Sequence, residues 1–248
     1  MKHIFYIVLC FMALLLTPSA RSENSTIARL AADLSADDTM TIEIAAEQLV
    51  ALGQPAIPTL LEALKSDHRD RKAAAMEALA ALGATQATEP ILDLFGKLGP
   101  VPKDTDTFSE GYLRHVAIRC LGRLGQPSAI PALQEAAKSP NLYDQTAAII
   151  GLAMAKQPQA LDKLIQLANA PNDDIRNMAV QGFALVRDPR TVPVLEAKLS
   201  DPRWYVRDNA VEALAAIGDA AAVQALKKAA EDSNPFVQRT AKEALAKL

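Results

Sequence analysis

Residues 201–219 read DPRWYVRDNAVEALAAIGD, and they predict one amphipathic helix. Ala210, Leu214 and Ile217 are separated by four and three residues, so their apolar side chains share one face of a helix. Gly218 follows directly and suits the left-handed conformation in which many helices end. A helix that is apolar on a single face buries that face against another element, so the stretch also predicts packed neighbours.

The same pattern recurs along the chain, in its later part with a period of 31 residues. Its first position is always an alanine, which we call the anchor alanine. The anchor alanines are Ala45, Ala75, Ala117, Ala148, Ala179, Ala210 and Ala241. A second apolar pair with a spacing of three residues, such as Val192 and Leu195, lies between consecutive copies. Each copy therefore predicts a pair of helices.

The sequence predicts seven helical hairpins, each with a short helix, a tight turn and a longer helix. They cover residues 24–52, 53–82, 87–124, 128–156, 158–187, 190–217 and 220–248. The residues predicted to cap the longer helices are Asp67, Asn141, Asn172, Asp201 and Asp232. One hairpin of about 30 residues cannot bury both of its apolar faces, whereas stacked hairpins can. We therefore expect an all-α fold, a right-handed α-solenoid over residues 23–248.

The stretch 201–219 resembles a HEAT repeat of the short type found in phycobilisome-lyase-like proteins, and residues 173–176 and 234–238 repeat the signal more loosely. The resemblance covers nearly all of residues 24–248. It implies a fold and says little about activity, because this architecture hosts many unrelated functions.

The resemblance also implies a ladder of ion pairs. In HEAT arrays the aspartate at the turn inside a repeat and the following arginine commonly link neighbouring repeats. Asp201 with Arg207, and Asp173 with Arg176, match this pattern. Gln145 stands where an arginine is expected, as does the glutamine of the last hairpin, so we expect the ladder to be incomplete.

The second helix of each HEAT hairpin usually lines the concave face, where a partner could bind. Groove-facing positions should lie two residues before the anchor alanine and two and six residues after it. In the third hairpin these positions hold His115, Arg119 and Arg123, and in the fourth they include Ile150 and Met154. Cations beside exposed apolar side chains predict a docking site for an acidic amphipathic segment of a protein partner. The alternative is a solvated face neutralised by nearby acids, with the two apolar residues in the core.

Two further features suggest contact surfaces. The anchors Ala75 and Ala117 are 42 residues apart instead of 31, which predicts an exposed loop near residues 96–111. Trp204 is the only tryptophan and stands next to Tyr205 at the start of a helix. It could anchor a partner, or it could seal the junction between hairpins five and six.

Residues 1–22 predict a secretory signal peptide. Lys2 and His3 precede an apolar run over residues 4–16, and small residues follow. The run is shorter than the roughly 20 apolar residues that span a bilayer, which favours cleavage over a retained anchor. With cleavage near Ala20 to Ser22, we expect a periplasmic or secreted protein without stable membrane insertion.

The composition excludes several classes of protein. Half of the residues are apolar, so the chain can bury enough surface to fold. The net charge of −3 provides no general basic field, and we expect no nucleic-acid partner. Only two cysteines are present, too few for a disulfide framework. One of them, Cys120, lies on an apolar helix face and should be a buried, inert thiol.

The sequence holds no recognisable catalytic pattern. The iron-dependent hydroxylases of HEAT-like architecture use repeated His-Glu pairs, but none of the three histidines here precedes a glutamate. A Gly-x-Ser-x-Gly elbow and a glycine-rich phosphate loop are also absent from the sequence. We therefore expect a binding scaffold with no catalytic, metal or cofactor site. The alternative is an accessory subunit of a lyase-type or oxidoreductase-type modifying enzyme, or a weakly active enzyme of that kind.

Overall fold

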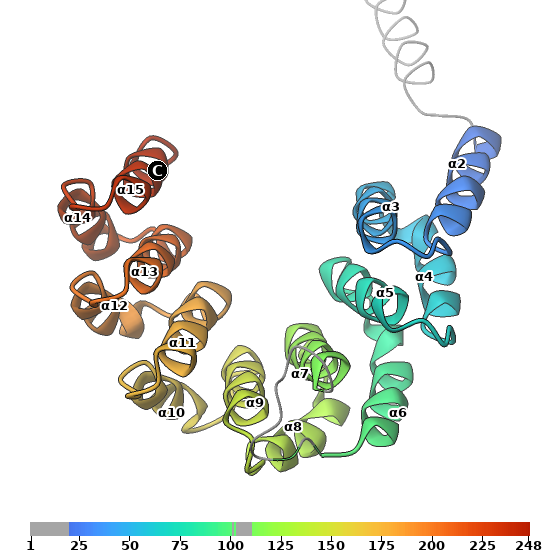
Figure 1. The fold of residues 1–248 in the computed structure, drawn as a ribbon, viewed down its shortest axis with the longest axis horizontal. Coiled ribbons are helices and arrows are strands. Elements are labelled where there is room, and N and C mark those ends of the chain that lie inside the picture. Colours follow the sequence, from blue (N-terminus) through green and yellow to red (C-terminus); the bar gives the residue numbers. More distant parts are fainter. Residues whose placement is uncertain (1–19, 101, 103–110) are drawn as a thin grey trace, which may run out of the picture. The chain divides into compact units, whose positions relative to one another are not determined.

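The computed structural model describes residues 20–100, 102 and 111–248. These residues form fourteen α-helices and no strand, and the helices follow one another as seven hairpins (Figure 1). The predicted all-α solenoid is thereby confirmed. Most of the predicted signal peptide lies outside the described residues, as does most of the loop near residues 96–111. In the part of the chain that is described, no helix is long and apolar enough to cross a membrane.

The chain divides into two compact units after Ala84. The described part of the first unit contains hairpins one and two. Its helices are α2 (Ala20–Asp33), α3 (Thr39–Leu52), α4 (Ile57–Ala63) and α5 (Arg69–Ala81). The first of these helices begins within the last residues of the predicted signal peptide.

The second unit contains hairpins three to seven. Its shorter first helices are α6 (Thr88–Leu98), α8 (Ile130–Ala136), α10 (Ala160–Leu167), α12 (Val192–Lys198) and α14 (Ala220–Ala229). Its second helices are α7 (Tyr112–Leu124), α9 (Leu142–Met154), α11 (Asp173–Val186), α13 (Trp204–Ile217) and α15 (Pro235–Leu245). The predicted single array from residue 23 to residue 248 would span both units and stays a prediction.

The anchor alanines lie in the cores of the two units, and each of the seven is at most 1% exposed. The residues four positions later are buried as well in six of the seven hairpins, among them Leu49, Phe183 and Leu214. The period in the sequence therefore predicted correctly which face of the second helix of each hairpin carries the buried anchor. Because alanine ends at Cβ, neighbouring helices can approach closely at these positions.

Asparagine side chains start several of the second helices. Asn141 and Asn172 cap α9 and α11 as predicted, because each side-chain oxygen accepts backbone N–H groups of the first turn. At the other three junctions the N-cap lies one or two residues later than predicted. Those N-caps are His68, Arg203 and Asn234. Asp201 and Asp232 instead accept the backbone N–H two residues further on, and bind arginines across the hairpin stack.

Glycines allow the closest helix contacts in the second unit. Gly122 of α7 faces Gly151 of α9, and a Cβ added to Gly122 would lie 2.3 Å from the Cα of Gly151. Gly182 of α11 faces Ile150 of α9, and a Cβ there would lie 2.7 Å from Cγ1 of Ile150. Helix α9 is thus packed tightly on both sides.

Candidate partner-binding groove

A pocket of about 510 Å³ opens between α7, α9 and α11, and we call it the central pocket. Its lining residues are Tyr112, His115, Val116 and Arg119 of α7, Tyr143, Ala147 and Ile150 of α9, and Asp174, Asn177, Met178, Gln181, Gly182 and Leu185 of α11. Apolar surface predominates in this lining. The volume lies in the range of ordinary ligand-binding pockets, about 300–1,000 Å³.

The repeat positions explain why these side chains meet. In α7 and α11 the lining includes the residues five and two positions before the anchor alanine and two positions after it. They are Tyr112, His115 and Arg119 in α7, and Asp174, Asn177 and Gln181 in α11. These offsets place side chains on one face of a helix. The groove-facing positions predicted for α7 and α11 therefore lie in one wall, with the exception of Arg123.

Helix α9 departs from this register. The repeat pattern places Thr146 in the groove, but this residue is buried and its hydroxyl donates to the carbonyl of Leu142 at 2.7 Å. Ala147 lines the pocket in its place. Of the two interpretations of Ile150 from the sequence, the structure contradicts an exposed apolar residue and supports a core position, because only 8% of it is exposed. It packs against Gly182 and contributes to the pocket wall.

A buried charge cluster lies next to the pocket wall that contains His115. Asp144 of α9 is fully buried, and Nε of Arg114 donates to its Oδ2 at 2.8 Å. Nε2 of His115 lies 2.8 Å from the other oxygen, Oδ1, although the two atoms lack the alignment of a hydrogen bond. Burial acts to raise the pKa of Asp144, but His115 and Arg114 outweigh it and hold that pKa below its ordinary value. This contact places the imidazole of His115 in the pocket wall.

The two remaining arginines of the predicted site are exposed, and they differ in position. Arg119 lines the central pocket. Arg123, one turn further along α7, lies outside the lining and forms no ion pair with any described residue. Met154 is half-buried at the end of α9 and is also outside the lining. The central pocket thus unites three of the six predicted site residues, His115, Arg119 and Ile150.

Trp204 belongs to a different surface. Its ring lies 5.5 Å from that of Phe236 in α15 and 6.1 Å from that of Tyr205 (centroid to centroid), and 44% of the residue is exposed. We call Trp204, Tyr205 and Phe236 the aromatic ledge. The guanidinium of Arg239 lies 5.6 Å from the ring centroid of Phe236. Trp204 therefore makes its aromatic contacts within α13 and towards hairpin seven, and its two interpretations from the sequence, a partner anchor or a seal of the junction between hairpins five and six, stay predictions.

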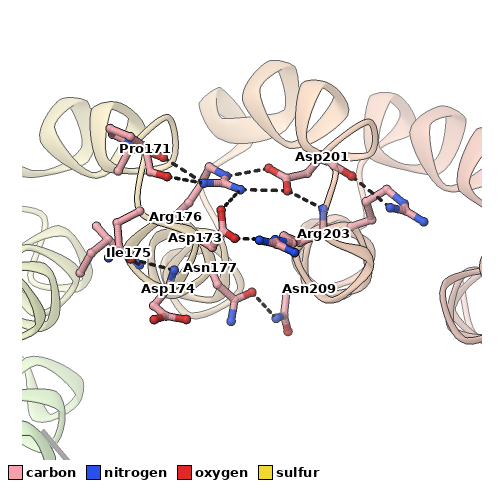
Figure 2. Close-up of polar contacts among 12 residues, drawn as sticks. Pro171, Asp173, Asp174, Ile175, Arg176, Asn177, Asp201, Arg203 and Asn209 are labelled. Carbon is pink, nitrogen blue, oxygen red and sulfur yellow. Dashed lines mark hydrogen bonds and ion pairs between the residues drawn. The ribbon is translucent and has the colours of Figure 1, made fainter. Parts of the chain in front are cut away.

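Ion pairs join successive hairpins on the side where the turns lie (Figure 2). Nε and Nη2 of Arg176 donate to the two carboxylate oxygens of Asp201 at 2.7 and 3.1 Å. Nη2 also donates to Asp173 at 2.9 Å, and Asp173 accepts a further hydrogen bond from Nε of Arg203. The predicted pairing of Asp201 with Arg207 is wrong. Arg207 forms its ion pair with Asp232 of the following hairpin, at 2.8 and 2.9 Å, and it contacts Asp201 only through the backbone carbonyl, to which its Nη1 donates at 3.0 Å.

Comparison with known families decides the architecture. A family model described as HEAT repeats matches residues 107–182 and 161–246, which together cover more than half of the chain. The chain belongs to the HEAT-repeat family. A second family model, the PBS lyase HEAT-like repeat, matches residues 72–97 of this HEAT-repeat chain. No curated protein matches it in sequence.

Solved structures of similar fold share little sequence with this HEAT-repeat chain. The complex of CpcE and CpcF of phycocyanin lyase from Nostoc sp. PCC7120 is 19% identical, with a TM-score of 0.54 over 88% of this chain and 93% of that one. Human deoxyhypusine hydroxylase in complex with glycerol is 21% identical, with a TM-score of 0.43 over 91% and 88%. A mutant of Kap121p is 15% identical, with a TM-score of 0.48 over 88% and 29%. At its low identity the comparison with the phycocyanin lyase complex shows the fold alone.

The arginine ladder of this HEAT array follows a rule that the sequence displays. Arg176 and Arg207 both reach an aspartate 25 residues later. The residue 25 positions after Arg114 is Ser139, which has no carboxylate, and Arg114 binds Asp144 instead. A spacing of 25 residues between arginine and aspartate, seen twice, is the signal that could have given the correct pairs.

One junction of the ladder lacks both partners. Gln145 occupies the arginine position of hairpin four, and Ala170 stands 25 residues later, where the aspartate would be. Between α9 and α11, Tyr143 donates from its hydroxyl to Oδ2 of Asp174 at 3.2 Å, an exposed contact. Elsewhere, Cys120 is buried, as predicted. The described residues hold no group of three or more histidine, cysteine or acidic side chains arranged for a metal ion.

Proposed function

We propose that this HEAT-repeat protein is an exported, non-catalytic scaffold that holds an acidic amphipathic segment of a protein partner in the groove of α7, α9 and α11. The observation that carries the proposal is the composition of the central pocket. Its walls combine apolar side chains such as Val116 and Ile150 with the basic side chains of His115 and Arg119. An apolar side chain of the partner enters the pocket, and a neighbouring carboxylate faces Arg119.

The charge distribution favours an acidic partner at this place. The whole chain carries a net charge of −3, yet α7 presents Arg119 and Arg123 on its exposed side. Asp174, the acidic residue of the lining, accepts a hydrogen bond from Tyr143. Complementary potentials mainly set specificity and association rate, so these arginines select an acidic segment from other apolar ones.

The comparison with CpcE and CpcF supports a protein partner in general terms. Those two chains, which share the fold, are described as a complex with each other. A solenoid offers an extended surface for such contacts, because each hairpin adds another pair of helices to it.

Export rests on the pattern of residues 1–22 and has its own test. The protein is expressed in its native cells with a C-terminal tag, the cells are fractionated, and the intact mass is measured. We expect the protein outside the cytoplasm, beginning after Ala20 or Ser22. A cytoplasmic protein that retains Met1 would overturn export and leave the binding proposal standing.

Binding is tested with a display library of random sixteen-residue peptides, selected on the purified protein. We expect enrichment of sequences that combine carboxylates with large apolar residues. The double variant Arg119→Glu/Arg123→Glu should lose this enrichment while it keeps a normal melting temperature. The matched control, Lys163→Glu/Lys227→Glu, changes the charge equally at exposed positions of α10 and α14 and should retain it. No enrichment on the wild-type protein would contradict the proposal.

The alternative of an accessory subunit has a test of its own. CpcE and CpcF, which share the fold, belong to a phycocyanin lyase, and this motivates the comparison. Protein purified from its native source is examined by absorption spectroscopy and metal analysis. A bound chromophore or a stoichiometric metal ion would contradict the scaffold proposal and support this second function.

A further inference from the structure

A row of side chains runs along one edge of the groove face in the second unit. It consists of the residues five positions before the anchor alanines of α7, α9, α11, α13 and α15, and we call it the edge row. Its members are Tyr112, Tyr143, Asp174, Tyr205 and Phe236. The first three line the central pocket, and the last two belong to the aromatic ledge. Equivalent positions of stacked repeats lie side by side, so the pocket and the ledge are parts of one surface.

Contacts between neighbouring helices support this continuity. Tyr143 donates to Asp174 between α9 and α11 at 3.2 Å. Asn209 of α13 donates from Nδ2 to Oδ1 of the pocket residue Asn177 at 2.8 Å, as Figure 2 shows. The rings of the ledge then connect α13 with α15. Every step from α9 to α15 is bridged by a side-chain contact on this face or its edge.

The charge of the groove face changes sign along the row. At α7 it carries the cations Arg119 and Arg123. At α13 the same helix face carries Asp208 and Glu212, and Oδ1 of Asp208 has no hydrogen-bond donor among the described residues. Although Glu212 is exposed, its pKa is raised, first by partial burial of the carboxyl group and then by the charge of Asp208. Negative charge at this end is therefore incompletely compensated, and a cation brought there would be favourable.

From these observations we infer that the partner segment lies extended along the edge row from α7 to α15, with acidic residues over α7 and basic residues over α13. The inference rests on the proposed function and gives the segment a conformation and a direction. The charge pattern supplies the direction, because the reversed segment would place like charges together at α7 and at α13. The half-buried tyrosines and the exposed ledge supply the apolar contacts, since aromatic residues and arginine are enriched at such interfaces.

The geometry gives the segment a length. Packed helices lie about 8–10 Å apart, so the four steps from α7 to α15 cover about 32–40 Å. An extended chain advances about 3.3 Å per residue, and it needs about 10–12 residues for this distance. Each helix of the array then meets about every third residue of the segment. A helical segment, which rises about 1.5 Å per residue, would need more than about 20 residues to cover the same row.

The length is tested with a peptide enriched in the display selection, shortened stepwise from each end. We expect affinity to fall when fewer than about ten residues remain. Phe236→Ala and Trp204→Ala should each weaken the full peptide about tenfold, as the truncation of an aromatic residue in an interface does. They should leave a fragment that reaches only the central pocket unchanged. Leu248→Ala removes another exposed apolar side chain and serves as the control that retains full affinity.

The direction is tested by charge reversal at the acidic residues of α13. Asp208→Lys/Glu212→Lys should weaken a peptide with a basic end about tenfold or more, and a peptide in which that end is made acidic should recover the loss. Recovery by the compensating peptide separates a direct contact from damage to the fold. Circular dichroism of the bound peptide should show no gain of helix.

Several results would overturn the inference while the proposed function survives. One is a peptide that requires Arg119 and Arg123 but binds equally well as a six-residue fragment. A second is an unchanged peptide affinity of the ledge variants and of Asp208→Lys/Glu212→Lys. A third is a gain of helix in the peptide on binding. Failure of the library to yield any peptide would instead contradict the proposed function itself, and the inference with it.

Discussion

Gly122 of α7 and Gly151 of α9 touch through their backbones, and no side chain lies between the two helices at this point. A Cβ on Gly122 would come within 2.3 Å of the Cα of Gly151 and within 3.3 Å of its carbonyl carbon. Those neighbours are backbone atoms, which cannot turn aside as the end of a side chain can. The two helices therefore meet backbone to backbone, next to the helix faces that form the central pocket.

The first prediction concerns this contact. Gly122→Ala should separate α7 from α9 and lower the free energy of unfolding by about 3 kcal/mol, as overpacking of a tight contact does. Urea denaturation measures the change. Gly96→Ala is the matched control, because Gly96 lies exposed in α6 with no atom within 4 Å of an added Cβ. It should stabilise the protein by about 0.5–1 kcal/mol through helix propensity. Equal effects of the two variants would mean that the glycine contact does not exist in solution.

The second prediction concerns the buried ladder. Arg176→Met should lower the free energy of unfolding by about 3–5 kcal/mol, because it leaves the buried Asp201 without its cation. The exposed pair of Lys228 and Glu196 provides the comparison. Lys228→Met should cost less than about 1 kcal/mol, as surface ion pairs do. Both changes are measured by chemical denaturation at neutral pH. A small loss for Arg176→Met would show that the ladder contributes little to stability.

The third prediction repairs the ladder between hairpins four and five. The double variant Gln145→Arg/Ala170→Asp supplies the two missing partners at the spacing of 25 residues. In a double-mutant cycle, we expect the gain in the free energy of unfolding of the double variant to exceed the sum of the changes in the two single variants by about 1 kcal/mol. Both positions are half-buried, so the new pair would resemble the existing ones. Additive effects of the two substitutions would show that the junction lacks the geometry of its neighbours.

The fourth prediction concerns acid. Hydrogen bonds from Arg207 hold the pKa of Asp232 below its ordinary value, and the unfolded chain has a pKa of about 3.9 for aspartate. The stabilisation is therefore complete above about pH 4 and is lost as the pH falls through the lower, folded value. Urea denaturation between pH 7 and pH 3 should show a constant free energy down to about pH 5 and a decline below pH 4. In Asp232→Asn, which cannot titrate, the decline should be smaller. An identical decline in both proteins would exclude Asp232 as a contributor.

The sequence predicted the helices well because their evidence is periodic and local. Ala210 and Leu214 share a face by geometry alone, and the structure buries both of them. The glycine at position 218 ends α13 in the left-handed conformation, also as predicted. Such features depend on a few consecutive residues, so the sequence contains all the information that is needed.

Contacts between hairpins are harder to predict. Because Asp201 and Arg207 are close in the chain, the sequence pairs them within one hairpin. In the structure, the stacking of hairpins brings Arg176 of the preceding hairpin to Asp201 instead. The helix position of Ile150 matches that of the exposed Arg119 and predicts a surface residue. Helix α9 is offset from its neighbours, and Gly182, which has no side chain, leaves room for Ile150 to lie inwards. Such offsets depend on how helices from different repeats fit together, which the pattern of one helix does not specify.

The aromatic ledge makes the protein its own optical probe. Trp204 is the only tryptophan in the chain, and it stands half-exposed beside the ring of Phe236. Emission excited at the red edge of the absorption band, where tyrosine does not absorb, comes from this single place. A molecule that covers the ledge removes water from the indole and shifts its emission to the blue, whereas a molecule confined to the central pocket leaves the spectrum unchanged. Occupancy at that end of the groove can therefore be followed in solution without a label.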